Sequence, residues 1–193
     1  MLYQLGRLIF NLVFRSLFRL KVIGAENVPA AGPVIFAANH NSYADPPLVG
    51  CVVKMPVYFM AKKELFEIPV LGWLIKRTHA FPVDRAAADF SALKNAANIL
   101  NSGKALLIFP EGTRHRAGRE RKLKNGAAML SVSTGSPVVP VAILNSGRLS
   151  RFPRLIIKFG PPVSFAAGTD YDYVTDEVMR RIMSLAGGQT ANG

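Results

Sequence analysis

Short apolar runs alternate along this chain with segments of helical periodicity, and this alternation restricts the fold more than any other feature of the sequence. The runs lie at residues 34–38, 57–61, 80–83, 105–109, 138–143 and 155–159. The clearest helical pattern between them covers residues 86–102 and ends at Gly103, a residue type that favours the end of a helix. Strands that alternate with helices are typical of α/β domains. The sequence therefore predicts an α/β fold with a mixed, largely parallel central sheet flanked by helices.

The 193 residues are predicted to form a single domain, since no stretch rich in Pro, Gly or Ser is long enough to separate two. We expect residues 1–20 to form an N-terminal amphipathic helix and residues 21–186 to form the main domain. Residues 187–193, GGQTANG, are typical of a flexible tail.

The chain is basic and hydrophobic at the same time. Its 24 Lys and Arg residues against 12 Asp and Glu give a net charge of +12, and 50% of its residues are hydrophobic. The hydrophobic content excludes intrinsic disorder, and the charge points to nucleic acid or anionic lipid as a partner. Only 19% of the residues are charged, whereas about 25% is usual, which favours a membrane surface. Cys51 is the single cysteine, which excludes a disulfide framework and multi-cysteine zinc sites and fits a cytosolic compartment.

The first twenty residues contain no acid, and their polar side chains recur every three or four positions. These form one stripe of Gln4, Arg7, Asn11, Arg15 and Arg19. We expect a helix that lies in the interface of an anionic membrane, with Arg7 and Arg15 toward the headgroups. The aromatic residues expected to contact lipid are Phe10, Phe14 and Phe18. Its apolar runs are too short to span a bilayer, so the predicted location is peripheral or monotopic, on the cytoplasmic face of the cell membrane. The alternative is a helix packed on the domain's own core.

A first polar segment follows the strand predicted at residues 34–38. It contains His40 and, five residues later, Asp45 at the start of a predicted helix. A turn between them can bring the carboxylate to one imidazole nitrogen and leave the other nitrogen as a general base. The alternative is that Asp45 caps the helix and His40 is a solvated loop residue.

A second polar segment follows the strand predicted at residues 105–109. Gly112 and Thr113 offer backbone N–H groups and a hydroxyl, and Arg114 offers a planar fork suited to phosphate oxygens. Neither a Walker A sequence nor a G-x-G-x-x-G fingerprint occurs. The segment is therefore typical of an anion-binding loop, or of an ordinary turn.

Three further features of the sequence have two or more possible roles. The basic run at residues 114–124 is either a solvated face or an extension of the anion site. Arg85, just past another predicted strand, either binds an anion or pairs with Asp84. The apolar stretch ELFEIPVLGWLI at residues 64–75 either lines an apolar groove, enters lipid or is buried in the core.

Together these segments resemble the lysophosphatidic acid acyltransferase family. Its N-H-x4-D motif is present as residues 39–45, and its F-P-E-G-T-R block is present unchanged as residues 109–114. A block that ends in Arg85 and an apolar V-P-V run at residues 139–141 stand in the family's order. The chain departs from the family at His115, where serine is usual, and at Leu123, where an aromatic residue is usual. These departures bear on substrate preference rather than on the reaction class.

The resemblance implies a glycerolipid acyltransferase-like fold and direct acyl transfer from acyl-CoA or an acyl carrier protein to a lysophospholipid. His40, held by Asp45, would deprotonate the acceptor hydroxyl. The residues expected to bind the acceptor's phosphate are Arg85, Glu111, Gly112, Thr113 and Arg114, with Asn39 and Lys124 in support. Among these, Glu111 would orient a hydroxyl or Arg114 rather than contact phosphate. No cofactor or metal is expected, because a thioester is already activated and no metal-ligand cluster is evident.

Two other functions remain as alternatives. One is acylation of another lyso-lipid or of glycerol 3-phosphate. The remote one is a non-enzymatic basic nucleic-acid-binding domain, although no RNP-like aromatic pattern or zinc finger occurs. A serine hydrolase would need a G-x-S-x-G elbow, which is absent.

Overall fold

The computed structural model describes residues 2–84, 89–114 and 123–187, and the described residues form one seven-stranded sheet with strand order β1-β7-β6-β2-β5-β3-β4. The strands are β1 (Lys21–Ile23), β2 (Val34–Ala38), β3 (Val57–Lys62), β4 (Ala80–Val83), β5 (Ala105–Ile108), β6 (Val138–Leu144) and β7 (Ile156–Phe159). Neighbouring strands run parallel except β6 and β7, which are antiparallel. The predicted mixed, largely parallel sheet is confirmed, and β1 is an additional edge strand that the sequence did not predict.

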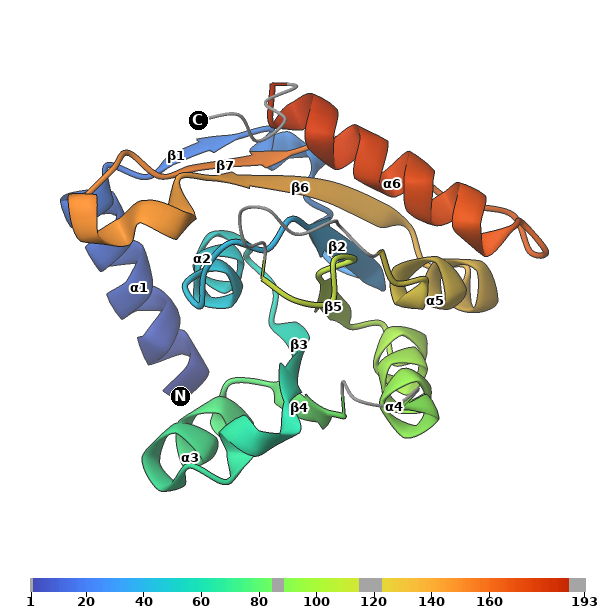
Figure 1. The fold of residues 1–193 in the computed structure, drawn as a ribbon, viewed down its shortest axis with the longest axis horizontal. Coiled ribbons are helices and arrows are strands. Elements are labelled where there is room, and N and C mark those ends of the chain that lie inside the picture. Colours follow the sequence, from blue (N-terminus) through green and yellow to red (C-terminus); the bar gives the residue numbers. More distant parts are fainter. Residues whose placement is uncertain (1, 85–88, 115–122, 188–193) are drawn as a thin grey trace.

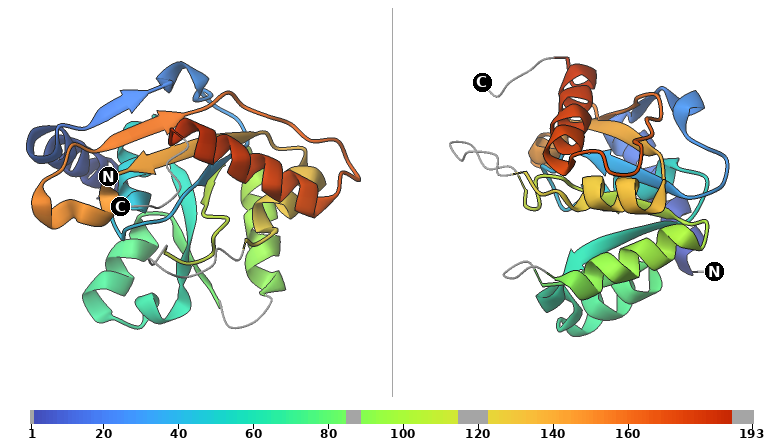
Figure 2. Two further views of the ribbon diagram at one scale, coloured as in Figure 1. Left: turned by 45° about the horizontal axis from the view of Figure 1, so that its top comes forward. Right: turned by 90° about the vertical axis from the view of Figure 1, so that its right-hand side faces the viewer.

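Helices cover both faces of this sheet (Figures 1 and 2). They are α1 (Leu2–Phe18), α2 (Asp45–Val52), α3 (Pro69–Arg77), α4 (Phe90–Asn101), α5 (Gly126–Thr134) and α6 (Tyr171–Leu185), with 3₁₀ turns η1 (Ala25–Asn27), η2 (Lys63–Phe66) and η3 (Ser146–Arg151). Figure 1 shows α1 and α2 on one side of the sheet, α4, α5 and α6 on the other, and α3 beside the edge strand β4.

The central strand β2 explains why the two faces are covered. All five of its residues are buried, and they alternate between two hydrophobic clusters. Phe36 packs with the residues of α1 and α2, whereas Ile35 and Ala37 pack with those of α4, α5 and α6. Because β2, β5 and β6 are parallel, their C-terminal ends lie at one edge of the sheet, which we call the carboxyl edge. Active sites of open α/β sheets form at such an edge.

The helix predicted for residues 86–102 is shorter than expected. It starts at Phe90, because the Asp89 side chain caps it by accepting a hydrogen bond from the backbone N–H of Ala92 at 2.9 Å. Residues 85–88 lie outside the described part of the chain, as do most of the tail predicted at 187–193 and most of the basic run at 114–124.

Part of the N-terminal helix face that was expected to contact membrane packs on the domain instead, although Phe10 and Arg15 are exposed. Phe14 and Phe18 are only 4% and 8% exposed and belong to the core, so the prediction that they contact lipid is wrong. The prediction for Arg7 is corrected as well, because its guanidinium donates to the carbonyl of Lys54 at 3.1 Å, just past α2. Asn11 likewise donates to the carbonyl of Cys51 at 3.2 Å. Arg7 and Asn11 of the polar stripe thus face protein, because backbone carbonyls accept their hydrogen bonds, whereas Gln4, Arg15 and Arg19 are exposed.

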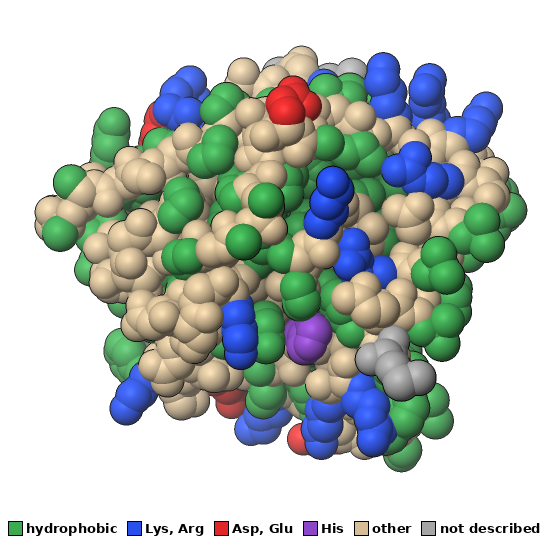
Figure 3. All heavy atoms as spheres, turned by 180° about the vertical axis from the view of Figure 1, so that it is seen from behind, with side chains coloured by type: hydrophobic (Ala, Val, Ile, Leu, Met, Phe, Trp, Pro, Cys, Tyr) green, Lys and Arg blue, Asp and Glu red, His purple; other side chains and the backbone are tan. Residues whose placement is uncertain are grey.

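The opposite face of α1 is apolar and exposed. Its exposed hydrophobic residues are Leu5, Leu8, Ile9, Phe10, Leu12 and Leu17. Seen from behind, hydrophobic side chains gather at the side of the molecule that α1 occupies, and acidic side chains are sparse (Figure 3). No helix in the described residues combines the length and the apolar character needed to cross a membrane.

The apolar stretch at residues 64–75 forms η2 and α3. Large side chains on it are exposed, including Ile68, Val70, Trp73 and Leu74. Gly72 is the buried residue of α3, and it packs against the backbone of Phe66 so closely that a Cβ would not fit. The stretch is therefore not a core segment.

Candidate active site

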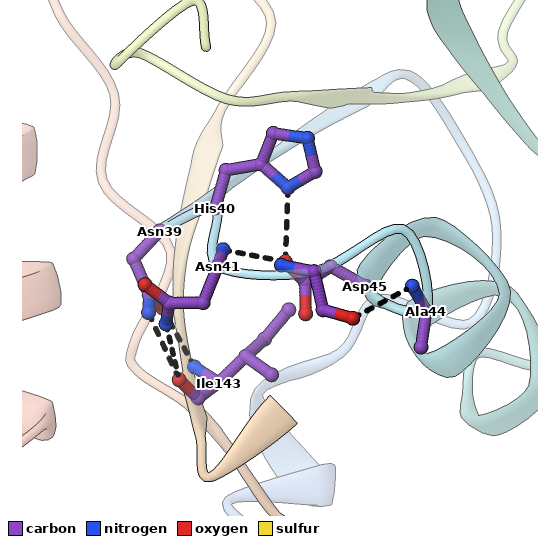
Figure 4. A network of polar contacts seen from close by, with 7 residues as sticks. Asn39, His40, Asn41, Ala44, Asp45 and Ile143 are labelled. Atoms are coloured by element: carbon purple, nitrogen blue, oxygen red, sulfur yellow. Dashed lines mark hydrogen bonds and ion pairs between the residues drawn. The ribbon is translucent and has the colours of Figure 1, made fainter. Parts of the chain in front are cut away.

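The first polar segment folds into a tight turn between β2 and α2. The Nδ1 atom of His40 lies 2.9 Å from Oδ2 of Asp45, and the two residues are only 6% and 0% exposed. The same oxygen accepts the backbone N–H groups of Asn41 and Ser42, each at 2.7 Å (Figure 4). Two backbone N–H groups and an imidazole nitrogen around one oxygen match a carboxylate, which can only accept. The predicted contact between His40 and Asp45 is thus present, and His40 is not a solvated loop residue.

Asp45 does stand at the start of α2, as the capping alternative assumed. However, its side chain caps no N–H of that helix and instead binds the turn before it. With the imidazole proton on Nδ1 and donated to Asp45, the Nε2 atom of His40 carries a lone pair. This is the arrangement that a general base requires.

Asn39 fastens the turn to the neighbouring strand. Its amide donates to the carbonyl of Ile143 at 2.9 Å and accepts the N–H of Ile143 at 2.7 Å. The side chain therefore pairs with β6 as one more residue of a strand would, which fixes the direction in which the chain leaves β2 (Figure 4). The support of phosphate binding that the sequence predicted for Asn39 stays a prediction.

The second polar segment lies directly beside the first. The ring of Phe109 stacks on the imidazole of His40, with centroids 4.0 Å apart and planes inclined by 19°. β5 and β2 are hydrogen-bonded neighbours, so the loops that follow them meet at the carboxyl edge. The sequence could place each segment after a strand but could not show that the two strands pair.

Within this loop the backbone is largely occupied. Gly112 adopts a left-handed φ of 65°, its N–H donates to the carbonyl of Phe109 at 2.9 Å, and the N–H of Thr113 donates to that of Glu111 at 2.7 Å. These N–H groups close the turn, so the expectation that they are offered to an anion is not met in this conformation. Glu111 is buried, and Lys124 packs on Gly112 and donates its backbone N–H to Pro110 at 2.8 Å.

Arg114 makes a second link between the two loops. Its Nη2 atom donates to the hydroxyl of Tyr43 at 2.8 Å, and its guanidinium carbon lies 3.6 Å from the centroid of the Tyr43 ring. Sequence reasoning missed Tyr43, although an exposed aromatic residue within the N-H-x4-D turn was a signal. Arg85 and His115 lie outside the described residues. Within the described ranges, no group of three or more His, Cys, Asp or Glu side chains is placed to hold a metal ion.

The site thus combines a buried imidazole, oriented by a carboxylate, with an arginine on the adjacent loop. The imidazole can remove a proton from a hydroxyl, and the arginine can bind an anionic group of the same substrate. Both loops come from the ends of central strands, so their spacing is fixed by the sheet.

Comparison with known proteins identifies the family of the chain. A family model described as "Acyltransferase" matches residues 19–144. A 1-acyl-sn-glycerol-3-phosphate acyltransferase of Bacillus subtilis (strain 168) is 36% identical over 124 residues, covering 64% of this chain and 61% of that protein. A protein of the same name from Streptococcus pneumoniae is 34% identical over 138 residues, covering 68% and 50%. The matched part spans between half and two thirds of the length of these two relatives.

The fold is similar to a solved structure over the whole chain. The crystal structure of the 1-acyl-sn-glycerophosphate (LPA) acyltransferase PlsC from Thermotoga maritima superposes with a TM-score of 0.77 and 28% sequence identity. The match covers 100% of this chain and 80% of that one. The family model covers well over half of the chain, including both loops of the site. The chain therefore belongs to the acyltransferase family.

Proposed function

We propose that this protein transfers a fatty acyl group from a thioester donor to the free hydroxyl of lysophosphatidic acid, which gives phosphatidic acid. The observation that carries the proposal is the buried His40–Asp45 pair beside the loop that bears Arg114. The names of the relatives support the same reaction. No cofactor is required, and the donor is acyl-CoA or an acyl carrier protein.

The proposed chemistry needs one proton to move twice. Nε2 of His40 takes the proton of the acceptor hydroxyl while the oxygen attacks the thioester carbonyl carbon. When the tetrahedral intermediate collapses, the carbon–sulfur bond breaks and the imidazolium returns the proton to the thiolate. Asp45 holds the imidazole in the tautomer with a free Nε2 and stabilises the imidazolium. A positioned general base contributes about 10²- to 10⁴-fold in rate.

The acceptor's phosphate is assigned to the loop after β5. Arg114 binds it through charge-assisted hydrogen bonds, and Arg85 is proposed as a second cation. Thr113 is exposed and offers a hydroxyl. Glu111 is buried, so we assign it the role of orienting a neighbouring polar group rather than of contacting the phosphate.

Membrane contact is assigned to the apolar face of α1. Leu8 and Leu12 are 68% and 65% exposed on this face, and Arg15 is exposed beside them. An amphipathic helix with this character lies in the interface of an anionic membrane. We therefore propose a peripheral or monotopic protein on the cytoplasmic face of the cell membrane, where its lipid acceptor resides.

The proposed reaction is tested by product analysis. The wild-type protein and the His40→Ala variant are offered lysophosphatidic acid, other lyso-lipids and glycerol 3-phosphate, each with acyl-CoA and with acyl carrier protein as donor. Mass spectrometry should detect phosphatidic acid formed by the wild-type protein and not by the variant. A product from glycerol 3-phosphate or another lyso-lipid, with none from lysophosphatidic acid, would replace the proposed acceptor.

A further inference from the structure

The segment that follows β6 lies beside the catalytic turn and has no part in the proposed chemistry. β6 runs parallel to β2 and reaches the carboxyl edge, where Asn39 pairs with Ile143. η3 begins two residues after β6, and a Cβ placed on Gly147 would lie 3.8 Å from the Cβ of Asn41. η3 therefore borders the turn that holds His40.

The surface of this segment is basic. Arg148, Arg151 and Arg154 are exposed on η3 and just after it. No Asp or Glu occurs in the sequence between Glu120 and Asp170. Arg151 and Arg154 therefore have no acidic residue near them in the sequence.

An exposed aromatic ring lies among these arginines. Phe152 is 57% exposed and has a left-handed φ of 47°, a conformation that is unfavourable for a residue with a bulky side chain. Its ring stacks on that of Phe18, with centroids 5.6 Å apart, and its N–H donates to the carbonyl of Leu149 at 3.0 Å. The fold thus holds an apolar ring in water, although folding otherwise favours its burial.

A row of aromatic rings joins this surface to α1. The rings of Phe10, Phe14, Phe18 and Phe152 form a row with successive centroids 5.8, 6.1 and 5.6 Å apart. The two ends of the row, Phe10 and Phe152, are exposed. Figure 1 shows η3 directly beside the C-terminal end of α1. Backbone hydrogen bonding joins the two, since the N–H of Leu155 donates to the carbonyl of Phe18 at 2.9 Å.

We propose that the η3 surface, formed by Arg151, Phe152 and Arg154, binds an anionic lipid bilayer and holds the carboxyl edge against it. The inference rests on the proposed function, because a lipid acceptor must reach His40 from the bilayer. Arginines near an anionic leaflet each strengthen binding by roughly fivefold, and an aromatic ring inserts at headgroup depth. An exposed phenylalanine in an apolar row fits lipid better than it fits a nucleic-acid backbone.

The first test compares two double variants that remove the same charge. Arg151→Gln/Arg154→Gln alters the η3 surface, whereas Lys94→Gln/Lys104→Gln alters α4 and the loop after it. Binding to phosphatidylglycerol-containing vesicles is measured by co-sedimentation. The η3 variant should bind at least tenfold more weakly than the wild-type protein, and the control should bind within about twofold of it. Equal losses in the two variants, or none in the η3 variant, would overturn the inference.

The second test separates membrane contact from chemistry. Acyl transfer is measured with lysophosphatidic acid held in vesicles and with a short-chain analogue that is monomeric in water. The η3 variant should lose at least tenfold in rate on the vesicle acceptor and keep the wild-type rate on the soluble one. An equal loss on both acceptors would contradict the inference. Absence of transfer by the wild-type protein would contradict the proposed function alone, because the vesicle-binding comparison does not depend on it.

Two further measurements address the ring and the rival partner. Phe152→Asn keeps a residue that tolerates the left-handed backbone, and it should weaken binding to vesicles of phosphatidylcholine as well as to anionic ones. Unchanged binding to both would contradict the role of the ring. A short DNA duplex provides the comparison for nucleic acid. If the η3 variant lost DNA binding and kept vesicle binding, nucleic acid would replace lipid as the partner.

Discussion

The imidazole of His40 lies flat against the ring of Phe109, with the ring centroids 4.0 Å apart. Together with the hydrogen bond to Asp45, this contact leaves the imidazole little freedom to turn. One residue comes from the loop after β2 and the other from the loop after β5, so the pairing of these strands places the base next to the loop that bears Arg114.

Replacing Phe109 tests whether the stacked ring positions the base. Phe109→Leu keeps an apolar side chain but removes the flat surface against which the imidazole lies. We expect kcat to fall by about tenfold, because small misplacements of a catalytic group are costly. KM for the acceptor should be unchanged, since Phe109 is assigned no contact with the phosphate. Steady-state kinetics measure both constants, and a rise in KM with an unchanged kcat would contradict this role.

The contact between Tyr43 and Arg114 predicts a non-additive pair of substitutions. Arg114→Ala should raise KM for the acceptor by about 10- to 100-fold, which corresponds to the loss of hydrogen bonds to a charged group. Tyr43→Ala should raise it severalfold, because Tyr43 fixes the guanidinium by stacking and by the 2.8 Å hydrogen bond. Tyr43→Phe, which keeps the stacked ring, should have a smaller effect.

If Tyr43 acts through Arg114, the double variant should be no worse than Arg114→Ala alone. Fully additive effects would show that the two side chains act separately. An unchanged KM in Arg114→Ala would remove the arginine from the phosphate site and leave the His40 assignment intact.

His79 predicts a dependence of stability on pH. Its ring lies against those of Tyr3 and Tyr58, with centroids 4.5 and 4.7 Å apart. Burial lowers its pKa from the ordinary value of 6.5, and the nearby Lys104 ammonium lowers that pKa further. The unfolded chain therefore binds the proton more readily than the folded protein. The stabilisation is complete above pH 6.5 and is lost as the pH falls through the lower, folded-state pKa.

Thermal unfolding at pH 7.5 and at pH 5 measures this effect. The wild-type Tm should be lower at the acidic pH by a few degrees, since the imidazole is only partly buried. The His79→Asn variant tolerates the left-handed backbone at this position (φ 65°) and should lose less on acidification. An equal loss in both proteins would assign the pH dependence to other groups.

The apolar face of α1 predicts the outcome of two surface substitutions. Leu8→Gln/Leu12→Gln removes apolar area that is exposed to water, so the free energy of unfolding should change little. Binding to anionic vesicles should fall by at least tenfold, because this area would otherwise be buried in the interface. Deleting the helix is a poor test, since Phe14 and Phe18 belong to the core. Retained vesicle binding in the double variant would move the membrane contact away from α1.

The catalytic pair could be predicted from the sequence because its geometry is local. His40 and Asp45 are five residues apart, and a strand end followed by a proline-containing helix start leaves room only for a turn. The strands β2, β5 and β6 could be predicted for a similar reason, since each is a buried apolar run between polar segments.

Features that depend on distant parts of the chain could not be predicted. β1 has only three residues, Lys21–Ile23, and it is a strand because β7 lies beside it. The periodicity of α1 showed a polar stripe, but only the carbonyls of Cys51 and Lys54 turn Arg7 and Asn11 of that stripe toward the domain. The contact between Tyr43 and Arg114 joins residues 71 positions apart and depends on the pairing of β2 with β5.

The central claim is that His40 removes the proton from the acceptor hydroxyl, and the rate of phosphatidic acid formation by His40→Ala tests it most directly. With saturating acceptor and donor, kcat should fall by about 10²- to 10⁴-fold. Circular dichroism and a cooperative thermal transition should show that the variant is folded. A folded His40→Ala protein that turns over at the wild-type rate would contradict the account.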